Sequence, residues 1–106
     1  MPTHQRPVIL INTFRLKAED PAKIIALLTK VTEESVVTAP GFEGAKLHLS
    51  LDGERVVMYA RWQSVGQYEA MRAGSGSMSA LQEIMETAIF EPGMFEVVRE
   101  FQPRDV

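Results

Sequence analysis

The sequence lacks cysteine, an excess of basic residues and any long apolar run, and each absence excludes a class of protein. None of the 106 residues is Cys, so disulfides, thiolate zinc sites, iron–sulfur clusters and cysteine nucleophiles are excluded. Small secreted domains usually need disulfides, so we expect a cytoplasmic protein. The apolar run that starts at Val8, VILI, is too short for a signal peptide or a membrane span, and we expect no membrane partner.

The charge balance argues against nucleic acid as a partner. Eleven basic residues stand against 14 acidic ones, which gives a net charge of −3, whereas a nucleic-acid interface needs a basic face. Apolar residues make up 45% and charged residues 24%, as in a soluble globular domain. The length fits one domain, and we expect residues 1–106 to form it.

The first half of the chain predicts a strand, a helix and a hairpin. Residues 8–16, VILINTFRL, alternate as a strand, and Asn12 shares parity with its buried apolar residues. Asp20 and Pro21 open a helix that fades near Val36. Residues 45–51 and 55–63 alternate as two strands, joined by a two-residue turn at Asp52-Gly53.

The second half predicts two helical pieces and a last strand. Ser64 with Gln67 has the spacing of a capping box and starts a short helix that breaks at Gly74-Ser75-Gly76-Ser77. Ser79 with Gln82 repeats the pattern and starts a helix that runs through Ala88 to Pro92-Gly93. Residues 94–101 alternate as the final strand.

The order β-α-β-β-α-β indicates an α+β fold of the ferredoxin-like, split βαβ type. It has an antiparallel sheet with helices on one face. The other face carries apolar groups too, with Val57, Tyr59 and Val98 as candidates to need cover. We therefore expect a homodimer with the two sheets packed face to face.

Three polar or amphipathic side chains are predicted to point inward and are candidates for chemistry. Asn12, Trp62 and Tyr68 each need polar partners when buried, so they are costly as core filling alone. Arg72, one turn beyond Tyr68, is placed to supply a cation. The alternative is structural: Trp62 packs in the core, the Tyr68 hydroxyl reaches solvent, and Asn12 is bonded to the backbone.

Other side chains are candidates for a pocket wall or for plain core. Met58 shares the strand face of Trp62, while Met71 and Met85 lie on the two helical pieces. Methionine commonly fills gaps in cores, but it also makes a soft wall for an aromatic ligand. The two histidines, His4 and His48, have no second ligand at metal-binding spacing, so we expect no metal.

The segment GERVVMYARWQSVGQY, from Gly53 to Tyr68, resembles the antibiotic biosynthesis monooxygenase family. Ala39-Pro40-Gly41-Phe42 with Gly44, and Asn12 in the first strand, also resemble it. The likeness runs over a core of about Val8 to Phe101. It is strongest to the cofactor-independent, quinone-forming monooxygenases of aromatic polyketide pathways.

The resemblance implies a dimeric α+β barrel whose pocket lies between sheet and helices. Trp62 matches the family's strand-end tryptophan, Tyr68 its helix tyrosine, and Asn12 an asparagine of some members; these are the implied catalytic residues. The implied substrate-binding residues are Met58, Arg72, Met71, Gln82 and Met85. Met58 stands where an asparagine is often found, and Gln82 where one branch has an arginine. Arg72 stands where heme-degrading relatives have their iron ligand, so heme degradation is not expected.

The implied function is oxidation of a polycyclic phenol or anthrone-like aromatic to a quinone by molecular oxygen, with no cofactor. An electron-rich phenolate can itself reduce oxygen, so the protein needs only to bind the ring and stabilise developing charge. Two alternatives remain open. One is a non-catalytic dimeric module of the same fold that binds a small aromatic. The other is a cofactor-free polyketide isomerase or cyclase.

Overall fold

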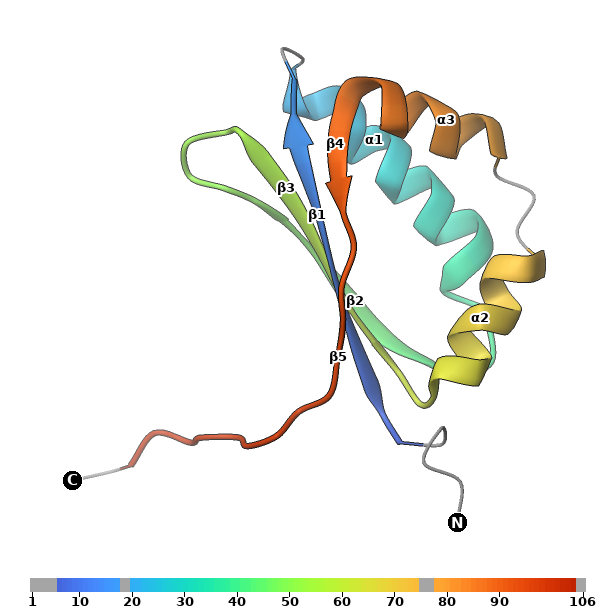
Figure 1. Ribbon diagram of the computed structural model, residues 1–106, viewed down its shortest axis with the longest axis vertical. Coiled ribbons are helices and arrows are strands. Elements are labelled where there is room, and N and C mark those ends of the chain that lie inside the picture. Colours follow the sequence, from blue (N-terminus) through green and yellow to red (C-terminus); the bar gives the residue numbers. More distant parts are fainter. Residues whose placement is uncertain (1–5, 18–19, 75–77, 105–106) are drawn as a thin grey trace.

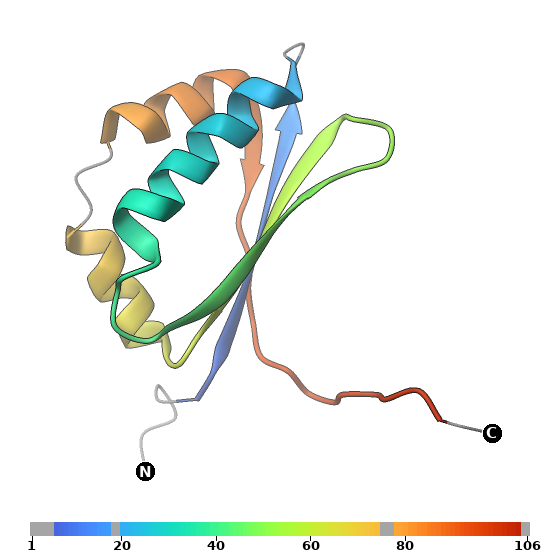
Figure 2. The same ribbon diagram turned by 180° about the vertical axis from the view of Figure 1, so that it is seen from behind.

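The computed structural model describes residues 6–17, 20–74 and 78–104. Its elements, in chain order, are β1 (Val8–Leu16), α1 (Pro21–Val31), a π-helical segment η2 (Thr32–Val36), β2 (Phe42–Leu49), β3 (Arg55–Trp62), α2 (Val65–Gly74), α3 (Met78–Thr87), β4 (Ala88–Glu91) and β5 (Met94–Phe95). The helices all lie on one side of a twisted sheet (Figures 1 and 2). The predicted α+β, ferredoxin-like architecture is therefore confirmed.

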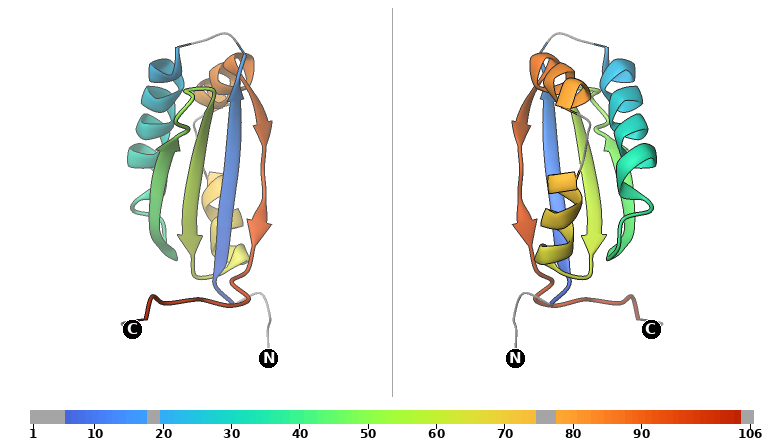
Figure 3. Two further views of the ribbon diagram at one scale, coloured as in Figure 1. Left: turned by 90° about the vertical axis from the view of Figure 1, so that its left-hand side faces the viewer. Right: turned by 90° about the vertical axis from the view of Figure 1, so that its right-hand side faces the viewer.

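The sheet is antiparallel throughout, with the strand order β2-β3-β1-β4. The short β5 continues beside β1 beyond β4, so β1 is flanked by β3 on one side and by β4 and β5 on the other. Figure 3 shows this order with the helix-free face toward the viewer in its left panel. We call that surface the open face.

Two helix starts follow the capping residues that the sequence predicts. The Asp20 side chain accepts a hydrogen bond from the Ala22 N–H at 3.0 Å, at the start of α1. The Ser64 hydroxyl accepts the Gln67 N–H at 3.2 Å and donates to the Gln67 side-chain oxygen at 3.1 Å, at the start of α2. These bonds satisfy N–H groups that the helix itself leaves unpaired.

The core beneath the helices consists of two separate groups of buried side chains. The Trp62 cluster lies at one end of the sheet and consists of Val8, Leu10, Ala60, Trp62 and Tyr68. The Phe14 cluster lies at the other end and consists of Phe14, Ile24, Leu28, Val56, Ile84 and Ala88. On β1 only Asn12 separates Leu10 from Phe14 on this face, so the amide stands between the two clusters.

The predictions for the second strand with its turn and for the Ser79 cap differ from the structure. The second strand spans Phe42–Leu49 rather than 45–51. The chain reverses through a loop wider than two residues, which is closed by the Ser50 N–H donating to the Arg55 carbonyl and the Arg55 N–H donating to the Ser50 hydroxyl. Helix α3 begins at Met78, so Ser79 lies within it and is not its cap. Residues 75–77, including most of the predicted break at Gly74–Ser77, lie outside the described residues.

The last strand is also misplaced by the sequence prediction. The second helical piece stops at Thr87, whose hydroxyl donates to the carbonyls of Glu83 and Ile84. Ala88–Glu91 then pairs with β1, where helix had been expected. Only Met94–Phe95 of the predicted strand 94–101 pairs, again with β1. Residues 96–104, the C-terminal arm, leave the sheet on the side of the open face (Figure 1).

Candidate active site

The sequence-predicted residues Trp62 and Tyr68 lie in contact at one end of the helical face. Trp62 closes β3 and is 1% exposed, and Tyr68 lies on the first turns of α2 and is 9% exposed. Their rings meet edge to face with centroids 5.7 Å apart. Phe42 of β2 packs on the indole from another side, with centroids 5.4 Å apart. Phe42 belongs to the family-like motif Ala39-Pro40-Gly41-Phe42, but no role in the site was predicted for it from the sequence.

The Trp62 indole N–H is free to donate a hydrogen bond. No bond joins it to any described residue, yet the described chain contains no fully buried side-chain nitrogen or oxygen without a partner. The N–H therefore lies in the small part of Trp62 that remains accessible. A donor held in this way by ring packing on two sides is suited to meet a developing negative charge.

Arg72 adds a positive charge beside this aromatic pair. Its guanidinium donates to the Tyr68 hydroxyl oxygen at 3.4 Å, and its central carbon lies 5.9 Å from the centre of the Tyr68 ring. The spacing of four residues on α2 makes this contact possible. Met71 of the same helix packs against the Trp62 cluster. The structure thus groups four predicted site residues: Trp62, Tyr68, Met71 and Arg72.

Asn12 and Met58 form a second group. They are direct partners in the β1–β3 register and share the helical face of the sheet. The Asn12 side chain is half-buried and makes no hydrogen bond within residues 6–17, 20–74 and 78–104, so it does not serve the backbone there. Trp62 pairs with Val8, four residues before Asn12, which places the two groups about 13 Å apart along the strands.

Gln82 and Met85 lie on α3, away from both groups. The Gln82 side chain is exposed, and Met85 is 46% exposed. Neither makes a hydrogen bond or an aromatic contact within the part of the chain that the structure describes.

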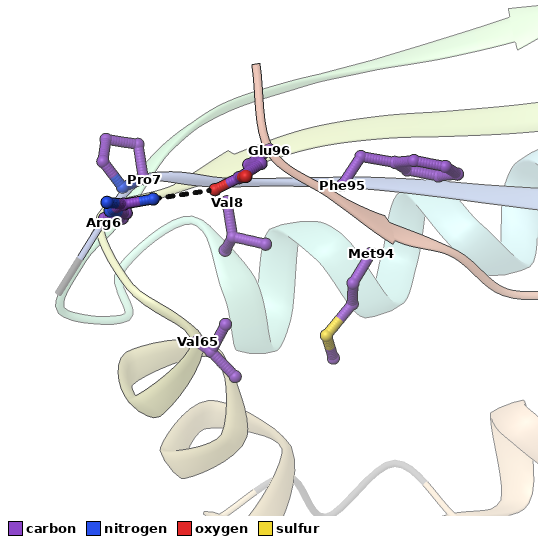
Figure 4. A pocket seen from close by; sticks show the side chains of 7 residues that line it. All are labelled: Arg6, Pro7, Val8, Val65, Met94, Phe95 and Glu96. Atoms are coloured by element: carbon purple, nitrogen blue, oxygen red, sulfur yellow. Dashed lines mark hydrogen bonds and ion pairs between the residues drawn. The ribbon is translucent and has the colours of Figure 1, made fainter. Parts of the chain in front are cut away.

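Two pockets open at opposite edges of the helical face. One, of about 190 Å³, lies beside β5 and is shown in Figure 4. There Val8, Val65 and Met94 point toward one another, and an ion pair of 3.4 Å joins Arg6 to Glu96 at the rim. The other, of about 200 Å³, lies between α1 and β2 and reaches Met58. Neither is lined by Trp62, Tyr68 or Asn12, which lie between the two.

The remaining site chemistry is limited. The described residues hold no cluster of three or more His, Cys, Asp or Glu side chains that would bind a metal ion. Within the same residues no helix has the length and apolar character needed to cross a membrane. His48 lies on the open face, where its ring nitrogen Nδ1 is 3.3 Å from the Val57 carbonyl oxygen.

The sequence profile of antibiotic biosynthesis monooxygenases matches residues 7–83, from the start of β1 into α3. The chain belongs to this family. Among curated relatives it is similar to the tetracenomycin-F1 monooxygenase of Streptomyces glaucescens, with 42% identity over 64 residues. That stretch covers 60% of this chain and 57% of the relative, so the match spans less than two thirds of the relative's length.

Solved structures of the family share the fold. One is the cofactor-independent oxygenase SnoaB from Streptomyces nogalater, with a TM-score of 0.80, 21% identity and coverage of 93% of this chain and 99% of that one. Another is the monooxygenase from the gene ActVA-Orf6 of Streptomyces coelicolor, in complex with nanaomycin D, with a TM-score of 0.80 and 23% identity. It covers 94% of this chain and 95% of its own. At these identities the likeness establishes the fold alone.

Proposed function

We propose that the chain is a cofactor-independent monooxygenase that oxidises a polycyclic phenol or anthrone-like aromatic to a quinone with dioxygen. The observation that carries the proposal is the arrangement of donors on one apolar sheet face. The indole N–H of Trp62 lies next to Tyr68 and Arg72 at one end, and the amide of Asn12 lies at the centre; neither group has a hydrogen-bond partner among the described residues. Similarity to a tetracenomycin-F1 monooxygenase supports the assignment.

The reaction balances without a cofactor because the substrate is the electron donor. An anthrone loses a proton from the carbon opposite its carbonyl and becomes an electron-rich anion. The anion gives an electron to dioxygen, and the two radicals join through a carbon–oxygen bond. Protonation yields a hydroperoxide, which loses water as its O–O bond breaks and a second carbonyl forms. One anthrone and one dioxygen thus give one anthraquinone and one water.

The residues have distinct roles in this proposal. Trp62 and Tyr68 donate hydrogen bonds to the oxygen that becomes negative when the substrate loses its proton, and so favour the anion. Asn12, about 13 Å away along the strands, donates to a second oxygen of the polycyclic substrate. Arg72, held against Tyr68, adds positive charge at the same end. Met58 and Met71 supply apolar walls for the rings, whereas Gln82 and Met85, which lie away from both groups, would contact only a part of the substrate that extends to α3.

Oxygen uptake with anthrone tests the function. The purified chain should consume one dioxygen for each anthraquinone formed, faster than a protein-free blank, and product formation should stop under nitrogen. Conversion that continues unchanged under nitrogen would identify an isomerase or cyclase. Tight binding of anthraquinone without oxygen uptake would identify a binding module instead.

We also propose that the chain forms a homodimer through the open face. Ile89 and Phe95 on that face are 53% and 51% exposed. The C-terminal arm extends past the same face, with Val98 at 89% and Phe101 at 81% exposure (Figure 1). A second copy would cover both surfaces together. Contiguous exposed apolar patches of this kind commonly mark interfaces between protein chains.

Sedimentation velocity tests the dimer. The wild-type chain should sediment as a species of twice its single-chain mass of 11.9 kDa. Val57→Asp, at the centre of the open face, should give a single-chain species. Ala26→Asp, on the exposed side of α1, is the matched control and should remain dimeric. A wild-type chain that sediments as a species of 11.9 kDa would refute the dimer.

A further inference from the structure

The pocket between α1 and β2 adjoins the proposed active site at Met58. Thr29, Thr32 and Glu33 line it from the helical side, and Ala45, Leu47 and Met58 line it from the sheet. Met58 belongs to both places, since it faces this pocket and is the register partner of Asn12. The pocket therefore lies next to the group formed by Asn12 and Met58, at the end of the site away from Trp62.

The pocket has the size of one aromatic ring. An apolar cavity of about 150 Å³ binds benzene, and this one measures about 200 Å³. Ala45 is the register partner of Ala60, so two small side chains lie next to each other between Trp62 and Met58. Trp62 and Met58 lie about 13 Å apart along β3, so a ligand that reaches from one to the other needs at least three linearly fused rings.

The local backbone of α1 changes its hydrogen bonding at the same place. The Val37 N–H donates to the Thr32 carbonyl five residues earlier, the spacing of a π-helix, over the segment Thr32–Val36. Single turns of this kind are frequent at functional sites. Here the turn presents Thr32 and Glu33 at the rim of the pocket.

The lining is apolar at its floor and rich in hydrogen-bonding groups at its rim. Leu47 and Met58 are half-buried and form the floor. The hydroxyl of Thr29 and the carboxylate of Glu33 are exposed at the rim, where both accept hydrogen bonds. This combination suits the flat body of an aromatic ring with a neutral hydroxyl group at its outer edge.

We propose that this pocket is the subsite for a hydroxylated outer ring of the substrate. The inference rests on the proposed function and narrows it to fused aromatics of at least three rings. The central ring lies over Asn12 and Met58, and the inner ring lies toward Trp62 and Tyr68. The outer hydroxyl donates to Glu33 at the rim of the pocket.

Binding of two quinones, measured without oxidation, tests the subsite. Trp62 is the sole tryptophan, so quenching of its fluorescence reports binding at the site. Quinizarin has three rings with both hydroxyls on an outer ring, and naphthoquinone has two rings. Ala45→Leu fills the pocket from the sheet, and Thr29→Leu narrows it from α1. Each variant should lower the affinity for quinizarin at least about tenfold, the usual effect of mismatched size in an apolar pocket. Each should change the affinity for naphthoquinone less than about twofold.

Matched variants separate the subsite from general effects. Ala26→Leu makes the same exchange on the exposed side of α1 and should leave both affinities unchanged. Glu33→Ala should weaken quinizarin, whereas the neighbouring Glu34→Ala should not. The subsite is refuted if the wild type binds neither quinone, or if Ala45→Leu and Thr29→Leu weaken both quinones equally or neither. A wild type that shows the expected binding pattern but consumes no oxygen with anthrone would refute the proposed oxidation and leave the subsite standing.

Discussion

The indole of Trp62 and the phenol ring of Tyr68 meet edge to face, 5.7 Å between centroids, at the junction of β3 and α2. Aromatic pairs of this kind contribute about 0.5–1.5 kcal/mol beyond the burial of their area. Both rings therefore hold the helix on the sheet as well as present a donor. A variant that tests catalysis has to keep the ring and remove only the polar atom.

Trp62→Phe is expected to lower turnover sharply and to leave the fold and the dimer in place. It keeps an aromatic ring in the Trp62 cluster but removes the indole N–H. Loss of one donor from an oxyanion site costs about 2.7–4 kcal/mol of transition-state stabilisation, which corresponds to a fall in kcat of about 100- to 1000-fold. Oxygen uptake with anthrone measures the fall in kcat, and sedimentation velocity checks that the variant remains a dimer.

Phe42→Leu is the control for packing around Trp62. It removes the other edge contact on the indole but no hydrogen-bond donor. We expect kcat to fall by less than about tenfold, because the N–H that stabilises charge remains. Equal losses in Trp62→Phe and Phe42→Leu would show that Trp62 acts through packing alone.

Asn12→Leu is expected to raise stability while it removes activity. Asn12 stands between Leu10 and Phe14 with no hydrogen bond to the described chain, so leucine would join the two core clusters. Replacement of an unsatisfied, half-buried amide should stabilise the fold by about 1 kcal/mol. Thermal unfolding and anthrone turnover, measured on the same sample, check the two effects. A destabilised variant would mean that Asn12 has a structural role.

The parts of the fold that depend on neighbouring residues were predictable from the sequence. Asp20 before Pro21 and Ser64 before Gln67 mark helix starts through bonds within three residues, and both bonds are present. The alternation of Val8–Leu16 likewise fixes which side of the strand faces the helices. These features need no knowledge of distant partners.

The parts that depend on distant pairing were not predictable. Ala88 follows Ile84 at helical spacing, yet its backbone pairs with Leu16 of β1, more than 70 residues away. The register between β1 and β3 sets Asn12 opposite Met58 and about 13 Å from Trp62, so three residues predicted at one cavity lie in two groups. The pocket at Thr32 depends on a π-helical turn for which the sequence offers no local signal.

Asp52 makes the stability of the β2–β3 loop depend on pH. Its carboxylate accepts the Ser50 hydroxyl at 2.7 Å and the Glu54 N–H at 3.0 Å, and these bonds lower its pKa below the ordinary value of 3.8. A carboxyl whose pKa is depressed by folding stabilises the fold above its unfolded pKa, and this contribution is lost as pH falls through the folded pKa. In Asp52→Asn, the backbone amides of this loop should therefore exchange their hydrogens faster than in the wild type at neutral pH.

Hydrogen exchange of the Glu54 and Arg55 amides at several pH values measures that difference. The difference in amide protection between wild type and Asp52→Asn should be greatest near pH 7. It should vanish once the pH is well below 3.8, where the wild-type carboxyl is protonated and carries no charge. Glu54→Gln removes a neighbouring exposed carboxylate and should leave the pH dependence of protection unchanged. A difference that persists unchanged in acid would show that the charge of Asp52 is not its cause.

Gly41→Ala is expected to disturb the site from a distance, through the contact of the Pro40-Gly41 turn with α2. Gly41 has φ of +90°, and an added Cβ would fall 2.4–2.7 Å from side-chain atoms of Gln67. Gly53 has φ of +76° and an added Cβ would meet nothing within 4 Å, so Gly53→Ala costs only the backbone strain of about 1–2 kcal/mol.

Both variants should lower the melting temperature, and Gly41→Ala should lower it by more. Only Gly41→Ala should shift the fluorescence maximum of Trp62, because Phe42 follows Gly41 directly and packs on the indole. Identical spectra for the two variants would show that the turn does not position Trp62.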